Sequence, residues 1–385
     1  MMKASFLVLL GTLGCAGPAH QIRHTHAHTT AIVHTRAAQF LNKLTPEQQT
    51  QAVAAYESPY RNRGFCYVLA HCKNDPAGIR ISALTATQKH DLHMFLARLL
   101  SDAGYYKAMS IMHREMLLQE MEDAHRAAPQ TITLTGSPAM PTWAPPKTRD
   151  HEAYYVAFFG DPRTDQHWAV RFEGHHLTVN VTWDHDHTQV SVSPVFFGAS
   201  PVAIPEAPKA GYPLWRATEG QQLLRRELFL AQEILQSFTD AQRSQSLWPT
   251  MPGAELQGGT TMPLKAAMLH AEVPGVPSSE MSEIGKHLLK ALTQSMADHV
   301  DTHIAPIQKM GHVNWRVWWR GDINTDDGEF YFRAVGDDRY LLEILLAGNF
   351  SVNSEHAANH VHIAFRDLTH DWDADVLGEH LHVHH

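Results

Sequence analysis

Near its C-terminus the chain reads Ala358-Asn359-His360-Val361-His362-Ile363-Ala364-Phe365-Arg366-Asp367. Polar and apolar residues alternate along this stretch, which is the pattern of a β-strand with one buried face. Because successive side chains of a strand point to opposite faces, the apolar residues are predicted to face a core, and His360, His362 and Arg366 share the other face. The strand therefore presents two imidazoles side by side, as a pair of metal ligands requires.

A second histidine pair lies near the middle of the chain, in Glu173-Gly174-His175-His176. The alternation continues through residues 177–181 and places His176 on the polar side of another strand. If the two strands lie together, His176, His360 and His362 form a three-imidazole group suited to zinc, copper or iron, and His175 is a fourth candidate ligand. The alternative is a hydrogen-bonded histidine cluster that lines a polar cleft without a metal.

Three charged residues are candidates for catalytic work beside these histidines: Glu173, Glu343 and Arg366. Either glutamate can complete the coordination, or act as the base that activates a metal-bound water. Asn359 is a candidate for orienting a ligand through a hydrogen bond. The alternative role for each glutamate is an ion pair with one of three arginines: Arg171, Arg333 or Arg366.

Composition limits what these patterns can mean. The chain has 29 histidines in 385 residues, so histidine pairs arise by chance, and only position and context can select the relevant ones. The formal net charge of −9 argues against a basic face for nucleic acid. The sequence has no P-loop, nucleophile elbow or dinucleotide fingerprint, which excludes the nucleotide-dependent enzymes and the serine and cysteine hydrolases known by those motifs.

The N-terminus predicts export. A short basic start, an apolar run over residues 6–13 and small residues after it are typical of a signal peptide, here residues 1–19 with cleavage after Ala19. A lipoprotein with a lipid anchor at Cys15 is the alternative. No other stretch is long enough for a transmembrane helix. We therefore expect a periplasmic or secreted protein, in which Cys66 and Cys72 form a disulfide or remain free thiols.

Both ends of the mature chain are rich in histidine. Residues 20–36 are predicted to be a His-rich tail, and residues 37–385 a single domain with a His-rich C-terminal end. Such tracts at exposed ends bind divalent metals loosely. Cleavage before His20 would instead create an N-terminal histidine that chelates copper through its amine and its ring.

Helix starts are marked by capping boxes, in which a threonine precedes a glutamine by three residues, at Thr45, Thr85 and Thr239. Further helical patterns cover about 104–126, 219–237 and 280–300. Residues 160–174 and 321–336 echo each other, because a Gly-Asp turn precedes a strand in both. The echo predicts two related strand units, with Glu343 at about the place of Asn180.

Fold class follows from this arrangement. The strands cluster in two blocks and do not alternate regularly with helices, so a parallel doubly wound fold is not expected. We predict an α+β domain with a largely antiparallel sheet, built from two related strand units with surrounding helices.

Four separated motifs, at residues 172–177, 196–201, 342–343 and 359–367, resemble in content and order the family called domain of unknown function 3500, a mostly bacterial and often exported group. The resemblance extends from the helix start at Thr45 to His380, and the chain departs from the family pattern at residues 345–357 and in its terminal histidine tracts. It implies one structural unit and points to the same histidines, but it implies no activity.

Together these observations predict an exported metal-binding protein whose cofactor is a transition-metal ion, zinc or copper, with iron third. The first hypothesis is a metalloenzyme with a mononuclear histidine site, hydrolytic with zinc and oxidative with copper or iron. The second is a non-catalytic periplasmic protein that binds or buffers metal through the same site and the terminal histidines. A role in protein interaction is the third. The substrate, small molecule or polymer, is left open.

Overall fold

The computed structural model describes residues 18–61, 77–127, 149–165, 167–183, 190–253, 256–258, 273–301, 313–326, 328–348 and 358–371. The strands are β1 (Val53–Ala54), β2 (Ile79–Arg80), β3 (Tyr154–Phe159), β4 (Trp168–Gly174), β5 (Leu177–Trp183), β6 (Val190–Ala199), β7 (Val276–Pro277), β8 (Trp315–Gly321), β9 (Phe330–Gly336), β10 (Tyr340–Ala347) and β11 (His360–Asp367). The α-helices are α1 (Pro18–Asn42), α2 (Pro46–Ala52), α4 (Ala86–Leu99), α5 (Asp102–Ala127), α6 (Pro213–Thr218), α7 (Arg225–Gln236), α8 (Asp240–Gln245) and α9 (Glu283–Ala297), with short 3₁₀ turns η1 (Ile81–Ala83) and η3 (Ser278–Glu280).

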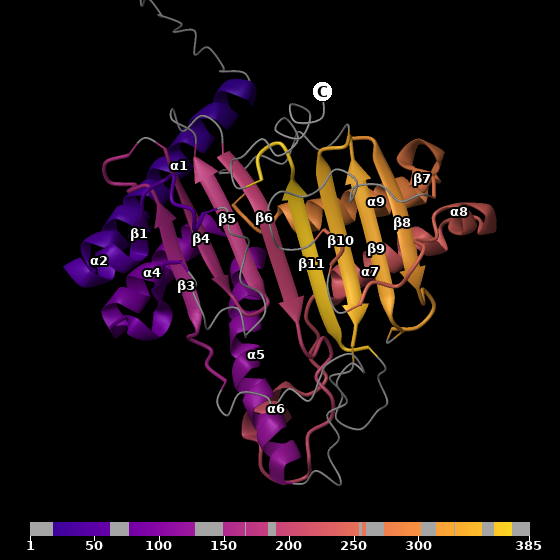
Figure 1. Ribbon diagram of the computed structural model, residues 1–385, viewed down its shortest axis with the longest axis horizontal. Coiled ribbons are helices and arrows are strands. Elements are labelled where there is room, and N and C mark those ends of the chain that lie inside the picture. Colours follow the sequence, from indigo (N-terminus) through magenta and orange to yellow (C-terminus); the bar gives the residue numbers. More distant parts are fainter. Residues whose placement is uncertain are drawn as a thin grey trace, which may run out of the picture.

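All the described strands join one sheet, in the spatial order β1-β3-β4-β5-β6-β11-β10-β9-β8-β7, with β2 also beside β3. The pairing of β1 with β3 is parallel, whereas the other strand pairs of the sheet are antiparallel. The fold is therefore mixed α+β with a large, mostly antiparallel sheet, as the sequence predicted (Figure 1).

Two four-stranded units make up most of this sheet. Strands β3 to β6 form one antiparallel meander, β8 to β11 form the other, and the units meet where β6 pairs with β11. Arg171 lies opposite Asn180 in the first unit, and Arg333 lies opposite Glu343 in the second. Glu343 thus takes the place of Asn180, and the pseudo-twofold arrangement expected from the sequence echo is present.

The echoing glycines have the same backbone role in both units. Gly160 has a φ of 78° and Gly321 a φ of 100°, a region that side chains disfavour. A Cβ would stand 2.6 Å from the carbonyl oxygen of His167 at the first position, and 2.0 Å from that of Glu329 at the second. Both turns therefore need glycine, which explains why this part of the repeat can be recognised in the sequence.

The repeat extends further than the sequence pattern indicated. In each half a capping-box helix, α2 or α8, precedes a short strand, a 3₁₀ turn and a long helix. The glutamine of each capping box also donates to the last residue of that 3₁₀ turn: Gln48 to the Ala83 carbonyl at 2.9 Å, and Gln242 to the Glu280 carbonyl at 2.8 Å. The capping boxes therefore join elements distant in sequence as well as starting helices. Helix α5 has no counterpart among the described residues.

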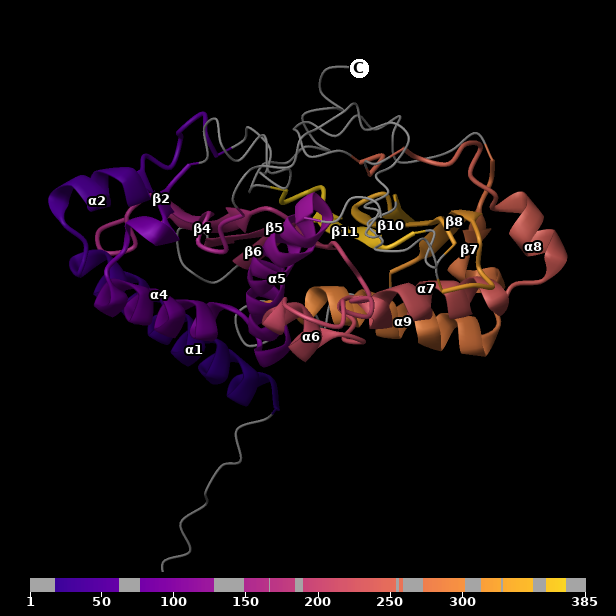
Figure 2. The same ribbon diagram turned by 90° about the horizontal axis from the view of Figure 1, so that it is seen from below.

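Helices cover one face of the sheet. Figure 2 shows α1 and α4 beneath the first unit, and α7 and α9 beneath the second. Most apolar residues of the strands point toward these helices and form the main core, which includes the stacked rings of Trp168 and Trp183, 4.1 Å apart. The capping boxes at Thr45, Thr85 and Thr239 are all present.

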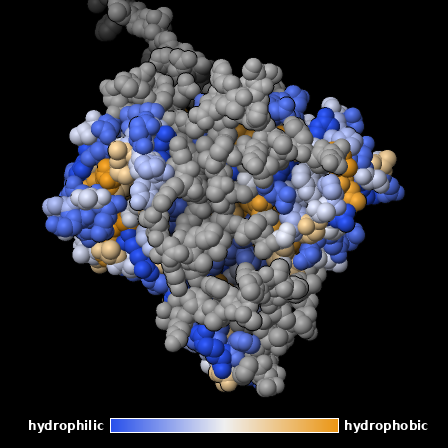
Figure 3. All heavy atoms as spheres, in the orientation of Figure 1, coloured by the Kyte–Doolittle hydropathy of each residue, from blue (hydrophilic) through white to orange (hydrophobic). Residues whose placement is uncertain are grey.

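The opposite face of the sheet is also buried, and it combines smaller apolar clusters, such as that of Phe196, Tyr331 and Leu345, with polar side chains. The residues that alternate with the core-facing ones include six charged or amide side chains with at most 2% exposure: Arg171, Glu173, Asn180, Arg333, Glu343 and Arg366. On the side of the molecule shown in Figure 3, the coloured side chains are mostly hydrophilic, and their hydrophobic patches are small. Polar groups buried in this way need internal partners, which are described below.

The N-terminal boundary differs from the expectation. Helix α1 runs through residues 20–36, which were expected to form a tail, and the predicted domain start at residue 37 lies inside it. Val33, Ala37 and Phe40 are fully buried because their spacing places them on one helix face, which packs on α4. Residues 1–17, Cys66, Cys72 and the C-terminal histidines from His380 lie outside the described residues. None of the described helices combines the length and apolarity needed to cross a membrane.

Candidate metal centre

His176 lies in the tight turn between β4 and β5, with a φ of 63°. The sequence analysis placed it within a strand, so its local geometry differs from the expectation. Its carbonyl oxygen accepts a hydrogen bond from the Gly198 amide of β6 at 2.7 Å. Gly198 in turn lies directly opposite His362 of β11. The His176 side chain therefore reaches β11 across an intervening strand, at a position where that strand carries no side chain.

The three predicted histidines meet at this point. His360 and His362 share one face of β11, with ring centroids 4.6 Å apart. The ring of His176 lies 4.7 Å from that of His360 and 5.3 Å from that of His362. The Nε2 atoms of His176 and His360 are 2.8 Å apart, and one candidate ligand atom from each of the three residues lies within 4.8 Å of the others. The group could hold a metal ion.

These separations can be compared with those of a metal site. Zn–N bonds of 2.0–2.1 Å in a tetrahedron place two ligand nitrogens about 3.3 Å apart. The Nε2 atoms of His176 and His360, 2.8 Å apart, would move slightly apart around an ion. The widest separation between the ligand atoms exceeds the tetrahedral value by at most about 1.5 Å. The ligand atoms are therefore near the separations of a mononuclear site, and three neutral nitrogen donors suit such an ion.

Burial favours the neutral form of the His176 and His360 rings. Burial lowers the pKa of His176 well below 6.5, and the neighbouring histidines His175, His360 and His362 lower it further. Burial, followed by the effects of His175 and Arg149, lowers the pKa of His360 to about 3. Neutral imidazole is the form that donates a lone pair to a metal, so these two rings need lose no proton to bind one at neutral pH.

His175 is turned to a different partner. Its ring stacks on that of His176 with centroids 4.0 Å apart, and its Nδ1 is hydrogen-bonded to the carboxylate of Glu115 on α5. Glu115 also pairs with Arg149 at 3.3 Å, and Arg149 reaches Glu122 at 2.5 Å. The ligand nitrogens that come together are those of His176, His360 and His362, so His175 lies beside that group.

Sequence reasoning missed the partners Glu115 and Arg149. Both are buried, and burial alone would raise the pKa of Glu115, but His175 and Arg149 lower it below its ordinary value. A signal was present in α5, where Glu115 and Glu122 lie seven residues apart on one face. Two acidic residues on an otherwise apolar helix face indicate a buried cationic partner, but they do not identify it.

The predicted catalytic residues all form ion pairs. The carboxylate of Glu343 accepts from Tyr331 and Arg333 at 2.6 Å each, and from the Gly258 amide at 2.7 Å. Glu173 lies 3.7 Å from the guanidinium of Arg171. Arg366 pairs with Asp371 at 2.9 Å. The arginine pairing considered for the two glutamates is thus present, and a catalytic role for these residues stays a prediction.

Asn359 has a structural partner as well. Its side chain accepts from the Ala203 amide and donates to the Ala203 carbonyl, both at 2.8 Å. Its backbone carbonyl accepts from the Val202 amide at 2.9 Å. Asn359 therefore fixes the segment after β6 against the start of β11, one residue before His360.

Fold and centre together define an α+β protein with a buried three-histidine group at the junction of two related sheet units. The family model described as "Protein of unknown function (DUF3500)" matches residues 26–374, which is most of the chain. The chain belongs to this family, as its motifs indicated. No curated protein and no solved structure matches it.

Proposed function

We propose that the protein is an exported metalloprotein in which His176, His360 and His362 hold one zinc or copper ion. The convergence of three candidate ligand atoms within 4.8 Å, drawn from a hairpin turn and a distant strand, carries the proposal. A chance pair of histidines is common in so histidine-rich a chain. Three buried or half-buried imidazoles that face one another across an intervening strand are not explained by composition.

A set of three imidazoles leaves a coordination position for water or substrate, which is typical of catalytic sites. The bound ion would supply an activated water if it is zinc, and redox chemistry if it is copper or iron. The residues of the chain have separate roles. Glu115 orients His175, whose ring packs on His176 and limits the positions this ligand can take. We therefore favour a metalloenzyme over a metal-buffering protein, because buffering does not require a ligand histidine to be held in position.

Metal content of the full chain, purified without an affinity tag and dialysed, tests the proposal. We expect about one ion per chain, and a loss of about tenfold or more in metal content in a His360→Ala variant, because a three-ligand site loses a direct ligand. His287→Ala is the matched control, since His287 is an exposed histidine on α9. An unchanged metal content in the His360→Ala variant would contradict the proposal.

The buffering alternative is tested on the same samples. A variant with glutamine at all tract histidines removes the loose sites and keeps His176, His360 and His362. The tract histidines are His20, His24, His26, His28, His380, His382, His384 and His385. Retention of the tight ion supports the centre, whereas loss of all bound metal with the tracts would assign binding to the termini.

A further inference from the structure

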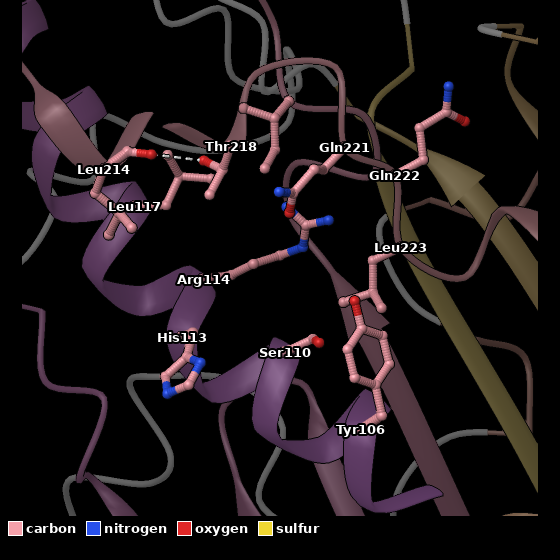
Figure 4. A pocket seen from close by; sticks show the side chains of 11 residues that line it. Tyr106, Ser110, His113, Arg114, Leu117, Leu214, Thr218, Gln221, Gln222 and Leu223 are labelled. Carbon is pink, nitrogen blue, oxygen red and sulfur yellow. Dashed lines mark hydrogen bonds between the residues drawn. The ribbon is translucent and has the colours of Figure 1, made fainter. Parts of the chain in front are cut away.

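A small cavity lies beside α5, separate from the three histidines. It is bounded by one side of α5, by Ile204, and by α6 with the residues that follow it, up to Leu223. Its volume is about 80 Å³. Figure 4 shows the side chain of Arg114 extending from α5 across this cavity toward Gln221.

Arg114 is a buried cation that lacks an acidic partner among the described residues. Its exposed fraction is 8%, and its Nη2 donates a long hydrogen bond of 3.4 Å to the Val202 carbonyl. No hydrogen-bond partner for its Nε occurs in the part of the chain that the structure describes. Burial lowers the pKa of this guanidinium to about 10. A buried charge of this kind is costly unless something compensates it.

Three other arginines with buried side chains have that compensation. Arg149 binds two glutamates, Arg333 pairs with Glu343, and Arg366 pairs with Asp371. Arg114 differs from them in that its guanidinium faces a cavity instead of a carboxylate. Because no carboxylate of the described residues compensates this charge, a bound anion is a candidate partner.

The lining of the cavity restricts the chemistry of that partner. Its polar groups other than Arg114 are neutral, as in Ser110 and Gln221, or belong to the exposed His113 at its edge. Leu117, Ile204 and Leu223 add an aliphatic wall. One guanidinium group can form two parallel hydrogen bonds to one carboxylate and neutralise its single negative charge. A phosphate dianion carries two negative charges, which is more than Arg114 neutralises.

We propose that this cavity binds a small aliphatic monocarboxylate, held by Arg114 through its carboxylate and by the leucine and isoleucine side chains through its carbon chain. Size agrees with this ligand class. A cavity needs about 10–15 Å³ to admit one water, so a cavity of about 80 Å³ has room for a small polar group and part of a short carbon chain. Butyrate, with six heavy atoms, is a small member of this class.

The cavity also has a structural connection to the three-histidine group. Arg114 directly precedes Glu115, which is hydrogen-bonded to His175. The backbone of Val202 is hydrogen-bonded to both Arg114 and Asn359. A bound carboxylate would therefore contact the segments that position the histidines. Its binding does not require a metal, so it can be tested on metal-free protein, independently of the proposed function.

Saturation-transfer NMR on the full chain in the presence of a chelator tests the proposal, with butyrate as the probe. Butyramide is the matched neutral probe. Inorganic phosphate, the anion without a carbon chain, has no carbon-bound protons to observe and is tested as a competitor of bound butyrate. We expect butyrate to bind, and butyramide and phosphate to bind at least about tenfold more weakly, because the charge-assisted fork contact and the aliphatic wall are both needed. Equal binding of butyrate and butyramide, no binding of butyrate, or displacement of butyrate by an equal concentration of phosphate would overturn the proposal.

An Arg114→Met variant tests the residue. We expect it to lose butyrate binding by about tenfold or more and to unfold at a temperature no lower than that of the native chain, because an uncompensated buried charge is replaced by an apolar chain of similar length. Arg126→Met is the control, since Arg126 is an exposed arginine on the same helix. Undiminished butyrate binding by Arg114→Met would contradict the proposal. A clearly lower unfolding temperature of this variant would also contradict it, because it would mean that the fold already compensates the charge of Arg114.

Discussion

Gly198 lies directly beside the imidazole ring of His176, and a Cβ at residue 198 would stand 2.8 Å from the ring carbon Cδ2. Real Cβ atoms do not approach other atoms so closely. The absence of a side chain on β6 is therefore what lets a residue of the β4–β5 turn reach the histidines of β11.

Gly198→Ala should displace the His176 ring and weaken metal binding. We expect a loss of about 10–100-fold in affinity, comparable with that seen when the support of a ligand is removed. Competition with a chromophoric chelator measures it. Gly253→Ala is the control, since a Cβ at residue 253 would meet nothing within 4 Å. Equal affinity in the two variants would mean that His176 is not held against Gly198.

Glu115→Gln should loosen the centre without removing a ligand. The His175 ring loses a charged acceptor, while Arg149 keeps Glu122. We expect metal affinity to fall by about tenfold, with the number of ions per chain unchanged. The free energy of unfolding should fall by about 1–3 kcal/mol. Asp123→Asn changes an exposed acid on the same helix and should change neither quantity. Complete loss of the ion would indicate instead that Glu115 is itself a ligand.

Glu343→Gln should destabilise the fold and leave the metal content intact. The substitution leaves Arg333, which is fully buried, without its carboxylate. Breaking a buried pair in this way costs about 3–5 kcal/mol, which chemical denaturation measures. Glu283→Gln, in an exposed pair with Lys286, should cost less than about 1 kcal/mol. A folded Glu343→Gln protein without metal would favour the catalytic or ligand role predicted from the sequence.

The metal-free protein should lose stability in mild acid. The pKa of His360 is lowered to about 3 in the folded chain, and that of His176 is also lowered. The unfolded chain takes up protons at the ordinary value of about 6.5, while the folded chain does not, so the folded state is disfavoured as the pH decreases. This part of the stability is fully present above about pH 6.5 and is lost progressively toward about pH 3.

Urea denaturation between about pH 7.5 and about pH 5 measures this slope. A His360→Gln variant should show a shallower slope than the native chain, because one histidine that resists protonation has been removed. His287→Gln, at an exposed site, is the control and should retain the native slope. A native slope in the His360→Gln variant would show that His360 does not contribute.

Much of the fold could be predicted from local patterns. The capping boxes at Thr45, Thr85 and Thr239 mark helix starts because threonine and glutamine satisfy backbone amides within one turn. Period-2 alternation assigned His360 and His362 to one face of β11 because strand geometry alone decides it. The N-terminal helix was missed because the high histidine content obscured the helical spacing of Val33, Ala37 and Phe40.

The sequence by itself determined the two-unit antiparallel sheet and the three histidines, since both follow from side-chain alternation and turn chemistry within short segments. Only the tertiary structure decided how the histidines meet. Strand β6 separates β5 from β11, and the His176 side chain passes over β6 at Gly198, where β6 has no side chain. It also decided that His175 pairs with Glu115 and that Arg114 faces a cavity. These contacts join segments far apart in the chain, and they depend on helix and strand packing that no local pattern encodes.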